Sequence, residues 1–170
     1  MTVAVTQASA SPYPLHAAAA EGNIDVFNTV VKEVDDLNVL NDEGQTPLHV
    51  AAIHGETTVG AYITECGGDV SVKDRDGNTA LHLAAIHNKR LFASMLLWGE
   101  ADPQTVNNKG NTALHEAAIR GNVQVIFIII NNGGESSKDI KNADGKTPLD
   151  LARESGDAQS IRFIETGDDL

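Results

Sequence analysis

The sequence predicts an all-α repeat solenoid, a stack of helix-turn-helix units that carry β-hairpin or turn fingers. Two observations lead to this prediction. A Pro/Ala-Leu-His/Asp triplet recurs at intervals of 33, 33, 33 and 35 residues, starting at Pro14, Pro47, Ala80, Ala113 and Pro148. A fixed period of this length indicates stacked repeats. Hydrophobic residues make up 41% of the 170 residues but aromatic ones only 4%, so alanine and aliphatic side chains must fill the core, which suits thin, closely spaced helices.

Each period from the second onward opens with a predicted turn. The turns read NDEG, DRDG, NNKG and NADG, and each ends in a glycine: Gly44, Gly77, Gly110 and Gly145. Glycine adopts a positive φ at no steric cost, as tight turns require. We therefore expect a finger-like turn in front of each of these repeats. Ser11 stands at the equivalent place before the first one.

A short, alanine-rich helix is predicted after each turn. Threonine, a good N-cap residue, stands at its start in four repeats: Thr46, Thr79, Thr112 and Thr147. Proline, favoured at the first helical position, follows two of these threonines. Glycine closes the helix in four repeats (Gly22, Gly55, Gly121 and Gly156), and Asn88 takes this place in the third. Both residue types favour a left-handed C-cap.

A second helix follows in each period, with apolar residues at helical spacing such as Val26, Phe27, Val30 and Val31. Helices of about two turns are unstable alone in water. Stacking buries their apolar faces against neighbouring repeats, which stabilises the array. The loop after the third second helix is irregular, because Gly99 comes one place early and leaves Glu100 at the glycine position.

These features together closely resemble the ankyrin repeat: Thr-Pro-Leu-His, a short apolar helix and a glycine turn on a 33-residue period. The resemblance implies five repeats, at residues 12–40, 41–73, 74–106, 107–141 and 142–165, with an N-terminal extension at 1–11 and a tail at 166–170. The first and last repeats depart from the pattern as capping repeats would. Tyr13 replaces threonine in the first, and Asp150 replaces histidine in the last.

Four histidines belong to the repeat itself: His16, His49, His82 and His115. The resemblance implies that each imidazole links a helix start and its threonine to the neighbouring turn. One identical group per repeat does not form a catalytic site, which needs different groups converging on one point. Nor does it supply the mixture of ligands expected of a zinc site.

The resemblance places a binding surface on the concave face, along the first helices. Ile53, Ile86 and Ile119 would form an apolar row there, beside a polar edge of His54, His87 and Arg120. Such a stripe suits a helix or an extended peptide. The alternatives are that the isoleucines pack on the next repeat and that the two histidines are solvated surface residues.

The finger tips are the second contact surface that the resemblance implies. They offer Asp42, Glu43, Arg75, Asp76, Asn108 and Lys109, acidic at the N-terminal end and mixed towards the C-terminal end. Such a gradient would orient an asymmetric partner.

Three further features lie away from the concave face. Trp98 ends the second helix of repeat three, either as an anchor for a partner or as a lid over the adjacent loop. The run VQVIFIIINN is apolar on all sides, so it either packs under the insertion near residues 133–140 or forms a second contact surface. We expect a monomer, with a dimer through the second helices as the alternative. Asn38 lies where asparagines of ankyrin-like turns are sometimes hydroxylated.

Charge and composition restrict the class of partner. The net charge is −12, with 24 acidic and 12 basic side chains. This charge disfavours nucleic acid and anionic lipid and favours a partner with a basic surface, although it also serves solubility. The longest apolar run is too short to span a membrane. The single cysteine excludes an intramolecular disulfide, and with no evident targeting segment we expect a cytoplasmic or nuclear protein.

The sequence therefore predicts a protein-binding module, an adaptor or a regulatory subunit, rather than an enzyme. It has no phosphate-binding glycine loop, nucleophile motif or metal signature, so we expect no catalytic residue, cofactor or metal. A spacer within a larger protein is the alternative. The partner's identity does not follow from a framework that unrelated binders share.

Overall fold

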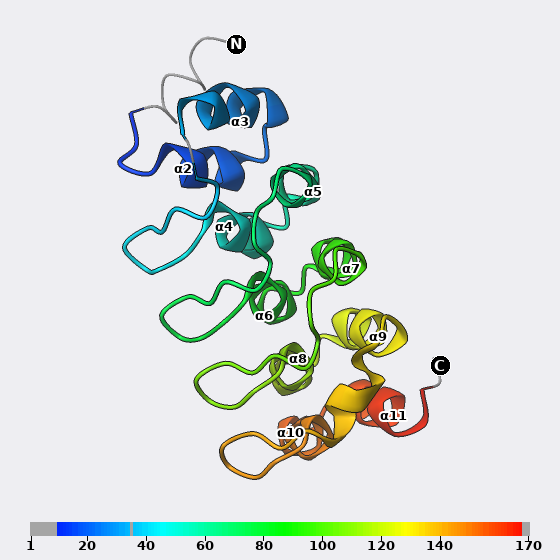
Figure 1. Ribbon diagram of the computed structural model, residues 1–170. Helices are drawn as coiled ribbons and strands as arrows, with labels where there is room; N and C mark the ends of the chain where they lie inside the picture. The colour runs from blue at the N-terminus through cyan, green and yellow to red at the C-terminus, as the bar shows by residue number, and fades with distance from the viewer. Residues whose placement is uncertain (1–9, 35, 168–170) are drawn as a thin grey trace.

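The computed structural model describes residues 10–34 and 36–167. Among these residues the helices form pairs that stack into a curved array, with one row of helices beside the fingers and a second row behind it (Figure 1). The inner row consists of α2 (Pro14–Glu21), α4 (Pro47–His54), α6 (Ala80–Ile86), α8 (Ala113–Arg120) and α10 (Pro148–Ser155). The outer row consists of α3 (Ile24–Val30), α5 (Thr57–Glu65), α7 (Arg90–Trp98), α9 (Val123–Asn131) and α11 (Ala158–Thr166). The predicted all-α solenoid is confirmed.

The fingers are tight turns, and no residue in the described ranges belongs to a β-strand. In the fourth repeat the backbone N–H of Asn107 donates to the carbonyl of Asn111 (2.9 Å), and the N–H of Gly110 donates to the carbonyl of Asn107 (2.9 Å). Neighbouring fingers are joined, since the N–H of Asn108 donates to the carbonyl of Asp76 at 3.0 Å. These bonds fix the fingers as one row along the inner helices.

The helix ends follow the sequence signals. Thr46, Thr79, Thr112 and Thr147 are extended N-cap residues, each in a capping box with the residue three places on. The predicted C-caps are left-handed, at φ 66, 82, 65 and 75° for Gly22, Gly55, Gly121 and Gly156. Asn88 adopts φ 55° in the place of glycine, and Glu100 adopts φ 66° where the irregular loop lacks one. Both of these non-glycine residues lie in repeat three.

The core runs the length of the array between the two rows of helices. Two successive alanines of each inner helix from α2 to α8 are fully buried, for example Ala51 and Ala52, and they allow the helices to approach closely. Larger side chains come mainly from the outer helices, where Phe27, Phe92 and Phe163 are almost completely buried. Small residues inside and larger ones outside make the core narrow at the inner row.

The insertion near the end of repeat four forms two 3₁₀ turns, η2 (Gly134–Asp139), which pack against α9. A shorter 3₁₀ helix, η1 (Val31–Glu33), continues α3. Ile130 at the end of α9 is 7% exposed, while Phe127, three residues earlier, is 37% exposed. The apolar run is therefore buried in part, as one of the two predicted alternatives requires. No helix in the described residues is long and apolar enough to cross a membrane.

Candidate protein-binding surface

The repeated histidines hold each finger to the preceding helix. In repeat three the backbone N–H of Thr79 donates to His82 Nδ1 (3.2 Å), and His82 Nε2 lies 2.9 Å from the carbonyl of Asn111 in the next finger. Because Nδ1 accepts and a carbonyl is the other partner, the proton is on Nε2 and the ring is neutral. His49 and His115 have the same contacts with Asn78 and Lys146. The predicted linking role is confirmed for these three residues.

The two ends of the array modify this link. His16 Nε2 lies 2.7 Å from the carbonyl of Gln45, but its Nδ1 is buried without a hydrogen bond, because Tyr13 offers no threonine hydroxyl and its N–H donates to Ser11. At the other end Asp150 Oδ2 accepts from both the N–H and the hydroxyl of Thr147. These hydrogen bonds lower the pKa of the Asp150 carboxyl. Asp150 thus accepts the hydrogen bonds at the helix start that histidine makes with threonine in the middle repeats.

The isoleucine row becomes more accessible towards the C-terminus. Ile53 and Ile86 are half-buried and pack partly against the core, as the packing alternative anticipated. Ile119 is 39% exposed. The exposed part of the predicted stripe therefore lies on repeat four.

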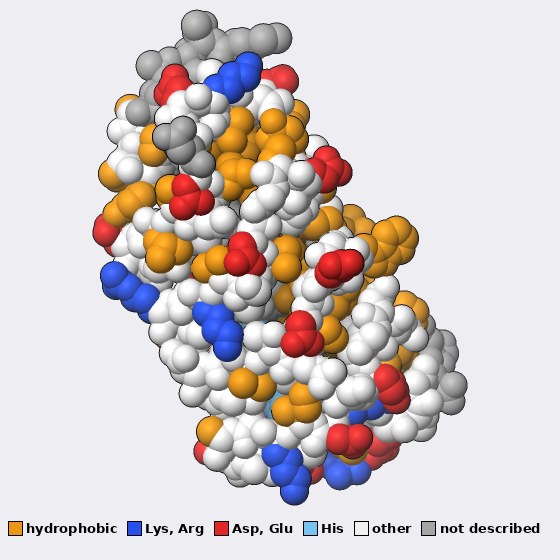
Figure 2. Space-filling model, viewed as in Figure 1, with side chains coloured by type: hydrophobic (Ala, Val, Ile, Leu, Met, Phe, Trp, Pro, Cys, Tyr) orange, Lys and Arg blue, Asp and Glu red, His pale blue; other side chains and the backbone are white. Residues whose placement is uncertain are grey.

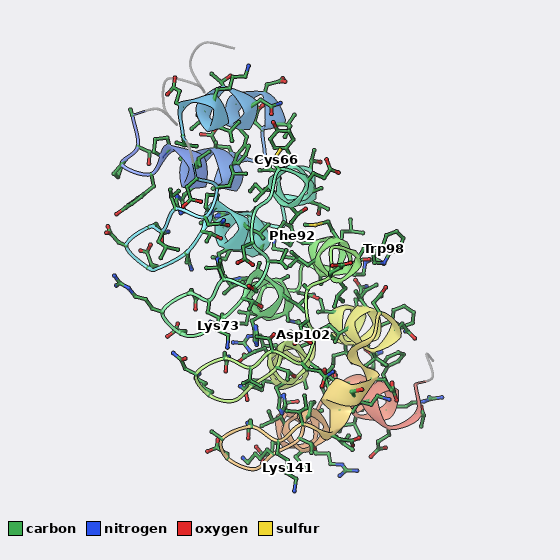
Figure 3. All side chains as sticks on the ribbon, viewed as in Figure 1. Cys66, Lys73, Phe92, Trp98, Asp102 and Lys141 are labelled. Carbon is green, nitrogen blue, oxygen red and sulfur yellow. The ribbon has the colours of Figure 1, made fainter. Side chains whose placement is uncertain are left out.

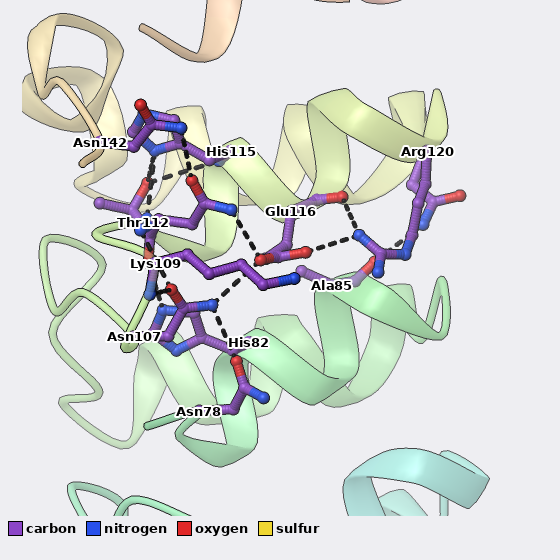
Figure 4. A network of polar contacts seen from close by, with 12 residues as sticks. Asn78, His82, Ala85, Asn107, Lys109, Thr112, His115, Glu116, Arg120 and Asn142 are labelled. Carbon is purple, nitrogen blue, oxygen red and sulfur yellow. Dashed lines mark hydrogen bonds and ion pairs between the residues drawn. The ribbon is translucent and has the colours of Figure 1, made fainter. Parts of the chain in front are cut away.

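A buried carboxylate on α8 was missed in the sequence. Glu116 is 4% exposed, and its Oε1 accepts hydrogen bonds from the side-chain amides of Asn107 (3.0 Å) and Asn111 (2.9 Å). Its Oε2 lies 2.6 Å from Arg120 NH1, which also donates to the carbonyl of Glu116. The Asn107 amide reaches Asn78 of the preceding finger at 2.9 Å. Figure 4 shows this network joining two fingers to one inner helix.

Glu116 is ionised in this network. Burial acts to raise its pKa, but the hydrogen bonds from Asn111, Asn107 and Arg120 outweigh burial and hold the pKa below its ordinary value. The sequence carried one signal for it: Glu116 occupies the slot that holds Val50, Leu83 and Leu151 in other repeats. A charge at an apolar repeat position, four residues before an arginine, is compatible with burial only if it is paired.

Two hollows flank this network and bring several predicted residues together. The first, of about 220 Å³, lies between fingers and inner helices and is lined in part by Asp76, Ile86, Asn108, Lys109, Glu116 and Arg120. The second, of about 340 Å³, is one step further along and is lined in part by Lys109, Glu116, Ile119, Arg120, Asp144 and Leu151. Lys109 and Arg120 therefore stand between two adjoining hollows that each contain one isoleucine of the row.

Other predicted residues lie away from these hollows. Asp42 accepts from the hydroxyl of Tyr13 at 2.6 Å on the first finger, and Glu43 accepts through its backbone from Arg75 on the next. His54 borders a third hollow, of about 300 Å³, together with Lys89 and Arg90. The predicted site residues are thus spread along the array rather than gathered at one hollow.

His87 is the C-cap residue of α6. It is exposed, and burial followed by the charges of Lys89, Arg120 and His54 lowers its pKa. His87 is exposed to solvent, as the surface alternative predicted, and the positive charges of Lys89 and Arg120 act on it.

The outer side carries separate apolar groups. Trp98 is 80% exposed, and its Nε1 donates to Asn132 Oδ1 of the next repeat at 3.0 Å; Figure 3 shows its ring projecting from the outer row. Leu91, on the same helix, is 64% exposed. Figure 2 shows apolar side chains gathered over the outer row, with acidic groups scattered around them. Asn38 Oδ1 accepts from the N–H of Asp69 at 2.8 Å and is half-buried.

Groups of three or more His, Cys, Asp or Glu side chains that could hold a metal ion are absent from the described ranges. Cys66 is exposed with a free thiol.

A family model described as ankyrin repeats, three copies, matches residues 15–105 and 88–169. A search of curated proteins found no significant match.

Proposed function

The chain belongs to the ankyrin repeat family, and from this premise we propose that it is an adaptor or a regulatory subunit that binds another protein and catalyses no reaction. Ankyrin repeats generally mediate protein–protein interaction. The observation that carries the proposal is the pair of adjoining hollows around Lys109 and Arg120, each with an isoleucine beside polar groups. Apolar surface with a few fixed polar groups favours a peptide segment over a flat contact.

The finger row extends this surface. Asp42 and Glu43 are exposed on the first finger, and together with the net charge of −12 they favour a basic surface on the part of the partner that faces them. We also infer a cytoplasmic or nuclear location, supported by the single free Cys66.

The test is affinity capture from the source cell with the triple variant Ile53→Ser, Ile86→Ser, Ile119→Ser. The proposal expects the variant to lose the proteins that the wild-type chain captures, because the apolar row no longer offers a dry contact. A control with Trp98→Ser on the outer row, which also tests whether this residue is an anchor, should keep them. Circular dichroism melts establish that both variants fold. Capture of the same proteins by the folded triple variant would favour the spacer alternative.

A further inference from the structure

A cluster of cationic groups lies where the inner helices end. We call it the cationic edge; it consists of Lys89, Arg90 and Arg120, with the imidazoles of His54 and His87 beside them. Of its members only Arg120 forms an ion pair with a described residue. The charged groups that act on His87 are Lys89, Arg120 and His54, with no carboxylate among them. Lys89 and Arg90 therefore have no ion-pair partner among the described residues, whereas one side of Arg120 is paired with Glu116.

This cluster runs against the composition of the chain. Acidic side chains outnumber basic ones by 24 to 12. Glu116 is paired with Arg120, and Asp76 and Asp144 of the fingers line the two hollows. The Glu56 carboxylate lies over Gly22, and Asp157 lies over Gly121, where it accepts from the N–H of Ser160 at 2.8 Å. In a chain so rich in carboxylates, the unpaired cations Lys89 and Arg90 beside Arg120 are a specific feature of the concave face.

Arg120 is held in a fixed position on this edge. Both contacts of its NH1 are with Glu116, at 2.6 Å to Oε2 and 3.1 Å to the carbonyl. Its Nε and NH2 have no hydrogen-bond partner among the described residues, and the side chain borders both hollows. A guanidinium anchored on one side, with free N–H groups on the other, is preorganised to bind a carboxylate with two hydrogen bonds.

We propose that the partner segment crossing α6 and α8 is acidic, with carboxylates on Arg120 and on the His87–Lys89 pair and with apolar side chains on Ile86 and Ile119. This inference rests on the proposed function and specifies its ligand. It leaves the basic surface opposite the first fingers in place, because charges further apart than about 8 Å are largely screened at physiological salt. The surface over α6 and α8 therefore selects an acidic segment, whereas the first fingers select a basic surface.

The first experiment is selection of phage-displayed random 12-residue peptides on the immobilised full chain. The inference expects selected peptides to combine Asp or Glu with aliphatic residues. The strongest binder is then synthesised with its carboxylates replaced by amides, which should weaken binding at least tenfold at 50 mM NaCl. Binding of the acidic peptide should also weaken as NaCl is raised to 500 mM.

Three variants locate the contact. Arg120→Gln should weaken the acidic peptide about tenfold. The double variant His87→Gln, Lys89→Gln should weaken it several-fold, and because it touches no ion pair it remains informative if Arg120→Gln unfolds. Arg162→Gln, on the exposed side of α11, is the matched control and should change nothing.

The outcomes separate this inference from the proposed function. Selected peptides rich in Lys or Arg that still depend on Ile53, Ile86 and Ile119 would overturn the acidic segment and keep the concave-face function. Acidic peptides whose affinity is unchanged by the variants of the cationic edge would also overturn it. Failure to select any peptide that the isoleucine triple variant loses would overturn both.

Discussion

At the scale of single residues, position within the repeat decides what a histidine does. His49 and His54 are five residues apart, yet the ring of His49 is 1% exposed and bonded at both nitrogens, while His54 is exposed beside a hollow. Repetition identified the first as scaffold, because one group per repeat on a lattice is a structural pattern. The equivalent position holds Glu21, His87 and Arg120 in other repeats, and this variation indicated that His54 is a surface residue.

The scaffold role predicts a loss of stability in a middle repeat. His82→Ala removes the partners of Thr79 and of the Asn111 carbonyl, and leaving buried polar groups unpaired costs about 1–3 kcal/mol. Thr79→Val should destabilise to a similar degree. Urea unfolding followed by circular dichroism measures both. His54→Ala is the control, expected to change the free energy of unfolding by less than about 0.5 kcal/mol; unfolding curves of His82→Ala that overlay the wild type would refute the scaffold role.

At the scale of elements, the helix ends were predictable because single local residues supply the backbone conformation that each end requires. The loop after α7 illustrates this. The array requires a left-handed residue after each outer helix in repeats two to four, and Gly67 and Gly133 supply it at φ 95 and 94°. In repeat three the glycine is displaced by one place, so Glu100 takes the conformation at φ 66°. A residue with a Cβ is disfavoured there by about 1–2 kcal/mol.

Replacing this glutamate with glycine should therefore stabilise the protein. Relief of the left-handed conformation, less the greater backbone entropy of glycine in the unfolded chain, gives an expected gain of about 0.5–1 kcal/mol for Glu100→Gly. Thermal unfolding measures the gain. Gly133→Ala is the matched reverse change, because no atom lies within 4 Å of the added Cβ and φ remains 94°. A lower melting temperature for Glu100→Gly would show that the loop gains its stability elsewhere.

At the scale of the whole molecule, the buried histidines act together because they recur along the array. Burial lowers the pKa of His49, His82 and His115 below the ordinary value of 6.5. Unfolded chains therefore take up protons near pH 6.5 while the folded rings stay neutral, so acid favours unfolding. The stability that these rings contribute is fully present above about pH 6.5 and is lost as the pH falls through the lower folded values.

We expect the urea midpoint at pH 5.5 to lie below that at pH 7.5. The range stays above the titration of most carboxylates, so the histidines dominate the change. His82→Ala should show a smaller difference between the two pH values, since one depressed group is gone. An equal or higher midpoint at pH 5.5 would contradict the neutral state assigned to these rings.

The sequence by itself determined the solenoid and the helix caps, because these depend on residues close in the chain and on a constant period. The role of the repeated histidines was implied by the resemblance to ankyrin repeats, and it depends on contacts between one repeat and the next. The tertiary structure decided how the concave face is charged. Glu116 is meaningful only because Asn107, Asn111 and Arg120 converge on it from a finger and a helix. The cationic edge likewise consists of residues at the ends of successive inner helices, and the net charge of −12 gives no indication of it. Periodicity specifies which residues occupy equivalent places, whereas contact between repeats decides which charges meet.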